Sequence, residues 1–110
     1  MQQRSDPVDR RPIAPETVIN RSPRAAFHPL AKGEGGVLLH VDTGAYHGVN
    51  RVGALIWELL ERPIALRDLL EGLRGRFTDA PPAMADEVSA FLTDLNARDL
   101  VELVPADRRP

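Results

Sequence analysis

The stretch TGAYHGVNRVGALIWELL, residues 43–60, changes from one structural pattern to another with almost no spacer. Thr43-Gly44 is typical of the exit from a tight turn, and residues 45–49 indicate a short strand. Asn50 follows, and it opens a run of apolar residues at helical spacing. The segment therefore predicts a strand that is joined directly to a helix.

The predicted strand at residues 45–49 contains no lysine, no proline and no charged residue. Sheet proteins place such residues on exposed strands to prevent pairing with another chain. An unguarded edge strand is either an aggregation hazard or a docking site for an extended peptide, which joins the sheet as one more strand. A central strand, covered on both sides by others, would need no such residues, and the sequence leaves these interpretations open.

The residues before this strand complete a hairpin. GVLLHV at residues 36–41 is rich in β-favouring residues, and DTG at 42–44 suits a three-residue loop closed by a left-handed glycine. Residues 37–41 and 45–49 are therefore predicted to pair. A first strand is expected within residues 17–31, which include the β-favouring patch Thr17-Val18-Ile19.

Three helices are predicted after the hairpin, the first capped by Asn50 and ended near Pro63. Asp99 occupies the position where a left-handed C-cap is expected after the third helix. This order predicts an α+β fold, winged helix-turn-helix-like, with a three-stranded antiparallel sheet followed by three helices. The apolar stripes of the three helices are Val52, Leu55, Ile56, Leu59, Leu60; Leu66, Leu69, Leu70, Leu73, Phe77; and Met84, Val88, Phe91, Leu92, Leu95. Trp57 lies off the first stripe and is expected to cover a secondary cluster.

With 110 residues the chain has room for one domain, predicted at residues 16–104 between a flexible proline-containing tail, 1–15, and a frayed end, 105–110. The chain contains no cysteine, which excludes disulfides, thiolate metal sites and thiol catalysis. The first residues lack the apolar centre of a signal peptide, and no stretch approaches membrane-spanning length. A cytoplasmic location is therefore expected.

The sequence carries no catalytic motif. Its serines are not in an elbow motif beside a histidine and an acid, and GEGG at 33–36 lacks the lysine of a phosphate loop. His40 and His47 lie on opposite arms of the hairpin and could approach each other, but zinc requires three or four ligands. We therefore expect a protein that is not an enzyme and needs no cofactor or metal.

A winged helix also raises the alternative of a DNA-binding or transcription-regulatory module. Its recognition helix would need arginines or lysines directed at phosphates and bases. The third predicted helix offers only Arg98 against Asp86, Glu87 and Asp94, and the net charge of the chain is −2. The basic residues gather instead near the N-terminus, at Arg10, Arg11, Arg21 and Arg24. The charge pattern thus disfavours nucleic acid.

TGAYHGVNRVGALIWELL, together with LRDLLEGLRGRF and DEVSAFLTDLNARDLVEL, resembles the PqqD-like peptide chaperones, which recognise precursor peptides of ribosomally made natural products. The resemblance runs from about residue 37 to residue 103. Asp99 departs from it, because the family usually has glycine there, and the N-terminal tail is longer than a minimal member needs. Its most specific residues are Gly44, Tyr46, Val49, Asn50, Gly53, Ile56, Trp57, Glu87, Val88, Phe91 and Leu92.

The resemblance implies that the chain binds the leader segment of a precursor peptide between the third strand and the third helix. It implies no catalysis; the core segment would be presented to separate enzymes, such as a leader peptidase and a cyclase in lasso peptide pathways, or a radical enzyme. The strand would be residues 45–49 and the helix residues 83–98. The predicted peptide-binding residues are Ala45, Tyr46, His47, Gly48, Val49, Glu87, Phe91, Asp94, Leu95 and Arg98.

Two questions about these residues stay open at the level of sequence. Tyr46 and His47 point to opposite faces of the sheet, so at most one of them faces the helix. Helical spacing places Glu87, Asp94 and Arg98 along one edge of the third helix, where they either set a charge preference or form a solvated flank.

Overall fold

The computed structural model of the chain describes residues 13–31, 34–76 and 83–105. Residues 1–12 of the tail predicted at 1–15, residues 106–110 of the frayed end predicted at 105–110, and the predicted stripe residue Phe77 lie outside the described residues. The elements in chain order are β1 (Val18–Arg21), β2 (Ala25–Pro29), β3 (Gly36–His40), β4 (Tyr46–Val49), α1 (Arg51–Leu59), β5 (Ile64–Ala65), α2 (Leu66–Arg74), α3 (Met84–Ala97) and β6 (Val101–Val104).

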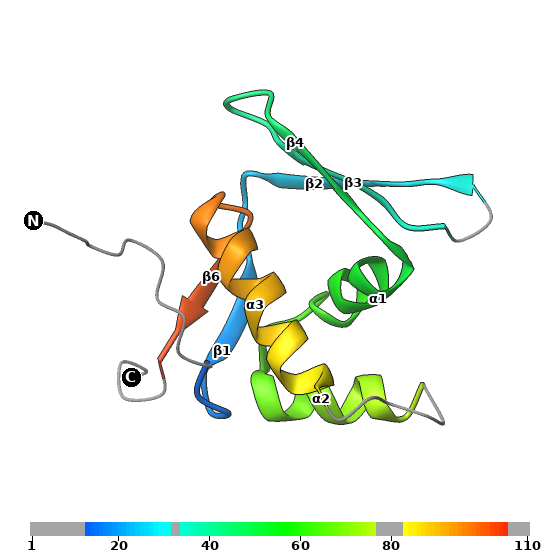
Figure 1. Ribbon diagram of the computed structural model, residues 1–110. Coiled ribbons are helices and arrows are strands. Elements are labelled where there is room, and N and C mark those ends of the chain that lie inside the picture. The colour runs from blue at the N-terminus through cyan, green and yellow to red at the C-terminus, as the bar shows by residue number, and fades with distance from the viewer. Residues whose placement is uncertain (1–12, 32–33, 77–82, 106–110) are drawn as a thin grey trace, which may run out of the picture.

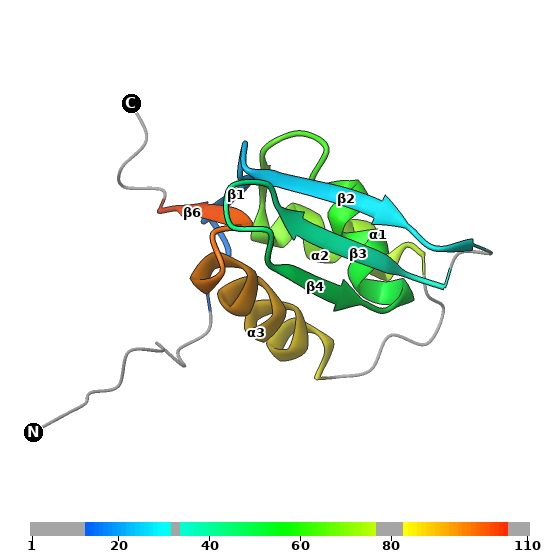
Figure 2. The same ribbon diagram turned by 90° about the horizontal axis from the view of Figure 1, so that it is seen from above.

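The strands form two antiparallel three-stranded sheets, with the orders β2-β3-β4 and β5-β1-β6. The first sheet lies over α1 in Figure 1, and Figure 2 shows α3 beside β4. The α+β class and the predicted three-stranded sheet followed by three helices are present. The second sheet was not predicted, because β5 has only two residues and the first strand region divides between the two sheets.

The predicted hairpin is formed by β3 and β4, which pair from Gly36 with Val49 to Leu39 with Tyr46. The His40 N–H donates to the Ala45 carbonyl at 2.8 Å, so residues 41–44 form the loop, one residue more than predicted. Gly44 has the expected left-handed conformation, with φ of 77°. The hairpin thus begins and ends within one residue of its predicted bounds.

Helix α1 follows β4 directly, and Asn50 caps it as predicted. The Asn50 side chain accepts a hydrogen bond from the Gly53 N–H at 2.8 Å. Gly53 also explains the close packing of α1, because a Cβ there would lie 3.0 Å from the Val49 Cβ and 3.1 Å from the Phe91 ring. Glycine at this position therefore lets α1 approach both β4 and α3.

The core is one cluster between the two sheets and the three helices. The buried members of the predicted stripes include Ile56, Leu69, Leu73, Val88, Leu92 and Leu95, while Leu55 and Leu59 are half-buried against the cluster and Val52 is exposed. Trp57 does not cover a separate cluster; it is 4% exposed within the core, and its ring centroid lies 6.3 Å from that of Phe27. The Arg21 guanidinium covers the Trp57 ring at 4.7 Å, so the aromatic ring is enclosed on several sides.

Helix α3 ends in the left-handed cap that the sequence predicted at Asp99. Asp99 has φ of 60°, its N–H donates to the Asn96 carbonyl at 3.1 Å, and the Leu100 N–H donates to the Leu95 carbonyl at 2.9 Å. This pair of bonds is a Schellman motif, and Leu95 and Leu100 are both buried. The chain then turns into β6 and returns along β1.

Candidate functional site

Among the residues that the structure describes, strand β4 pairs with β3 alone, which places β4 at the edge of its sheet. The sequence left open whether this strand is at the edge or in the centre of its sheet, and the structure shows that it is at the edge. Antiparallel strands bond at every second residue pair, and the bond from His40 to Ala45 sets the phase of that alternation. The backbone N–H and C=O groups of Tyr46 and Gly48 therefore point away from β3.

Helix α3 lies along this free edge. The His47 Nε2 atom is 3.6 Å from Asp94 Oδ2, which places the histidine side chain against the helix. Tyr46 projects from the opposite face of the sheet and is 75% exposed. His47 is therefore the one of the two residues that faces α3. We call the space along the free edge of β4 that faces α3 the β4–α3 groove.

A hollow of about 160 Å³ lies at the end of this groove where β4 begins and α3 finishes. Arg98 borders it, with its Nε donating to both carboxylate oxygens of Asp94 at 3.2 Å. The hollow is therefore bordered on the helix side by the Arg98–Asp94 ion pair and by the buried, apolar Leu100. Its lining residues are His40, Ala45, Tyr46, His47, Arg98 and Leu100.

The structure brings together part of the predicted set. Ala45, Tyr46, His47 and Arg98 border the hollow, and Asp94 reaches it through His47 and Arg98. The remaining predicted residues differ in exposure: Gly48 and Glu87 are exposed, Phe91 is half-buried, and Val49 and Leu95 are buried.

His40 and Leu100 border the hollow but were not in the predicted set. Two sequence signals could have found them. His40 is the hairpin partner of Ala45, and Leu100 follows the predicted C-cap.

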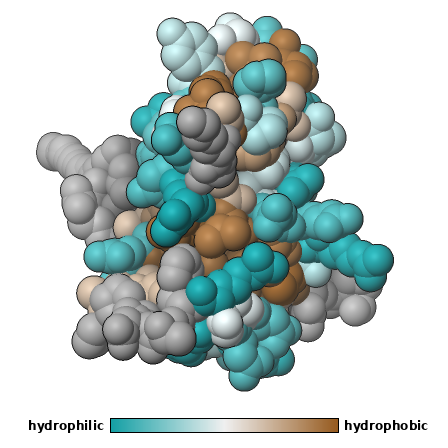
Figure 3. Space-filling view, turned by 90° about the vertical axis from the view of Figure 1, so that its right-hand side faces the viewer, coloured by the Kyte–Doolittle hydropathy of each residue, from teal (hydrophilic) through white to brown (hydrophobic). Residues whose placement is uncertain are grey.

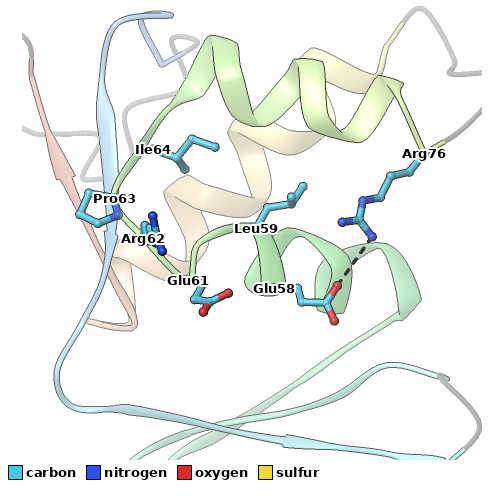
Figure 4. A pocket seen from close by; sticks show the side chains of 7 residues that line it. All are labelled: Glu58, Leu59, Glu61, Arg62, Pro63, Ile64 and Arg76. Carbon is cyan, nitrogen blue, oxygen red and sulfur yellow. Dashed lines mark ion pairs between the residues drawn. The ribbon is translucent and has the colours of Figure 1, made fainter.

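Two larger hollows lie away from β4 and α3. One of about 560 Å³ lies at the ends of α1 and α2 and is bordered by four charged side chains, among them the Glu58–Arg76 pair at 3.7 Å (Figure 4). Another of about 320 Å³ separates α1 from the end of β2. The molecular face in Figure 3 has apolar surface at its centre, bordered by hydrophilic side chains. The first of these hollows is bordered mainly by charged side chains, and the second by Phe27 and Pro29 of β2, an edge strand that ends in proline.

Among residues 13–31, 34–76 and 83–105, no three histidine, aspartate or glutamate side chains are grouped so that they could hold a metal ion. In the same residues, no helix has the length and apolar character needed to cross a bilayer. His40 Nε2 is hydrogen-bonded to Asp99 at 3.0 Å, and His47 Nε2 lies 3.6 Å from a carboxylate oxygen of a different aspartate, Asp94.

Comparison with known proteins places the chain in a family. Residues 35–101, more than half of the chain, match the family described as coenzyme PQQ synthesis protein D (PqqD). The chain belongs to the PqqD family. Its fold is similar to that of TbiB1 in complex with the TbiA(beta) leader peptide, with a TM-score of 0.65 and 26% sequence identity. That similarity covers 76% of this chain and 94% of TbiB1. No curated protein matches the chain.

Proposed function

We propose that this PqqD-family protein binds the leader segment of a ribosomally made precursor peptide as one more strand on β4, in the β4–α3 groove. The observation that carries the proposal is the free, uncharged edge of β4 beside α3. Membership of the PqqD family supports it, as does the similar fold of TbiB1 with its bound leader peptide. We assign the protein to a lasso peptide pathway or a related one.

In this proposal, backbone groups of β4 provide affinity for the leader, and side chains on β4 and α3 provide specificity. The outward groups of Tyr46 and Gly48 would pair with the backbone of the leader, which gives affinity largely independent of sequence. Alternate leader side chains would then face α3, where His47, Asp94 and Arg98 meet them. The hollow beside Arg98 would receive one of these side chains, which gives specificity.

The charged residues on α3 are proposed to set the charge preference of the groove. Asp94 is half-buried between His47 and Arg98, while Glu87 is exposed nearer the start of the helix. Phe91, half-buried between them on the same edge, would offer apolar contact to the leader. Val49 and Leu95 would support the groove from the core.

The protein is proposed to perform no chemistry itself and to present the core segment to separate enzymes. A leader peptidase and a cyclase, or a radical enzyme, are the partners that the family resemblance suggests. A DNA-binding role is not favoured, because α3 would bring Asp86, Glu87 and Asp94 to the duplex against Arg98 alone.

The test is calorimetric titration with synthetic leader segments of the short precursors encoded beside the gene of this chain. Double substitution Asp94→Arg with Glu87→Arg should change leader affinity by about tenfold or more, because it reverses the charge along one side of the groove. Both side chains reach the surface, so circular dichroism and melting temperature should stay close to wild type.

The matched control is Asp68→Arg with Glu71→Arg on α2, which changes net charge equally at two exposed positions. It should leave affinity near the wild-type value. Wild-type affinity in the folded α3 variant would mean that the groove lies elsewhere. Failure of every such leader to bind the wild-type chain would contradict the proposed function itself.

A further inference from the structure

We infer that Asp99 and His40 are positioning residues, whose side-chain contact fixes the width of the β4–α3 groove at the end where β4 begins. The inference rests on the proposed function of the groove. It assigns a role to the aspartate that stands where the resemblance to PqqD-like chaperones leads one to expect glycine.

His40 connects the hairpin loop to the end of α3. Its Nδ1 atom accepts hydrogen bonds from the Asp42 and Thr43 N–H groups, both at 3.3 Å. This fixes Nε2 as the donor to Asp99 Oδ2, at 3.0 Å. The His40 side chain is only 10% exposed, and both of its ring nitrogens are hydrogen-bonded. One buried ring thus holds the loop at residues 41–44 and the turn after α3 together.

Asp99 makes this contact from a backbone conformation that residues other than glycine rarely adopt. With φ of 60°, the residue is in the left-handed region, which glycine adopts without steric cost. Strained positions of this kind persist where surrounding contacts hold them, and they gather at functional sites. Here the carboxylate also lies 3.8 Å from Arg24, which in turn lies 3.2 Å from Asp42. The side chain therefore joins three separate segments of the chain.

The contact lies at the closed end of the proposed groove. His40 itself borders the hollow of about 160 Å³, as do Arg98 and Leu100, the two neighbours of Asp99. Further along α3, the Phe91 ring packs close to Gly53 of α1. The helix is thus held at two points along the groove, by Gly53 and by the His40–Asp99 contact.

Two substitutions separate this positioning role from ordinary stabilisation. Asp99→Gly removes the carboxylate and relieves the backbone, so the melting temperature should not fall. Asp99→Asn keeps an acceptor for His40 and tolerates the left-handed region. If the contact positions α3, Asp99→Gly should weaken leader binding by about tenfold, and Asp99→Asn should stay within about threefold of wild type.

A measurement without ligand completes the test. Because the chain has no cysteine, spin labels can be attached at Val41→Cys on the hairpin and Ala97→Cys on α3, both exposed positions. We expect a single narrow distance distribution in the wild-type background and in Asp99→Asn, and a broader, longer one in Asp99→Gly. An unchanged distribution in Asp99→Gly would overturn the inference.

Two further results would also overturn it: a changed distance with unchanged leader affinity, or an equal loss of affinity in Asp99→Asn and Asp99→Gly. The spin-label distances need no leader. A wild-type chain that binds no leader would therefore count against the proposed function, and the distances would still judge the His40–Asp99 contact.

Discussion

The two sheets of this protein differ in how their edges are protected. The second sheet has β5 at one edge, only two residues long and preceded by Pro63, and β6 at the other, which carries Glu102 and is followed by Pro105. In the first sheet, β2 ends in Pro29. Short length, charge and proline are the usual protections against pairing with another chain. Strand β4 carries neither charge nor proline.

The difference shows that the open edge of β4 is specific to one place in the molecule. Both edges next to α3 belong to four-residue strands, β4 and β6, yet only β4 lacks a charge. An open, uncharged edge invites pairing with another chain, and we propose that the neighbouring α3 limits this pairing at β4 to a single extended peptide. On this proposal, peptide binding at β4 is compatible with protection from self-association.

The largest effect is expected from Gly48→Pro. The Gly48 N–H points away from β3, so proline removes a donor from the free edge without breaking a bond of the hairpin. Leader affinity should fall by about a hundredfold or more, as measured by calorimetric titration.

Gly48→Ala is the matched control, because a Cβ at this position meets no atom within 4 Å and the N–H is retained. It should bind the leader with affinity close to wild type. An equal loss of leader affinity in Gly48→Pro and Gly48→Ala would contradict this account of the β4 edge, because the Gly48 N–H would then have no special role in binding.

Smaller effects on the free energy of unfolding are expected when a helix glycine is replaced by alanine. The sign should differ between Gly53 in α1, which follows β4, and Gly72 in α2, which follows β5. Gly53→Ala in α1 places a Cβ 3.0 Å from the Val49 Cβ and should lower the free energy of unfolding by about 1 kcal/mol. Gly72→Ala in α2 meets only Leu59, at 3.5 Å, and should raise it by about 0.5–1 kcal/mol through helix propensity.

Denaturant unfolding of both variants measures this difference. Stabilisation by Gly53→Ala would contradict the close packing of α1 against β4 and α3.

Local signals made much of the fold predictable. The hairpin, the Asn50 cap, the helical stripes and the left-handed Asp99 depend on residues close together in the chain. Strands β5 and β6 were missed because both pair with β1, far away in sequence, and β5 has only two residues.

The site was predictable to the extent that its residues follow from strand and helix periodicity. The orientation of His47 required the register of β4 and the position of α3, which no local pattern contains. The role of His40 depends on Asp99, which is 59 residues away along the chain. The sequence indicated the backbone of Asp99 correctly, but its side-chain partners are set by tertiary packing.

Amide hydrogen exchange, read by NMR with and without a bound leader, tests the central claim most directly. Strand addition at β4 should slow exchange of the Tyr46 and Gly48 amides, which face the free edge. The outward amides of β6, at Val101 and Leu103, provide the internal comparison and should be unchanged. Saturating leader that leaves Tyr46 and Gly48 unprotected, or that protects β6 instead, would contradict strand addition at β4.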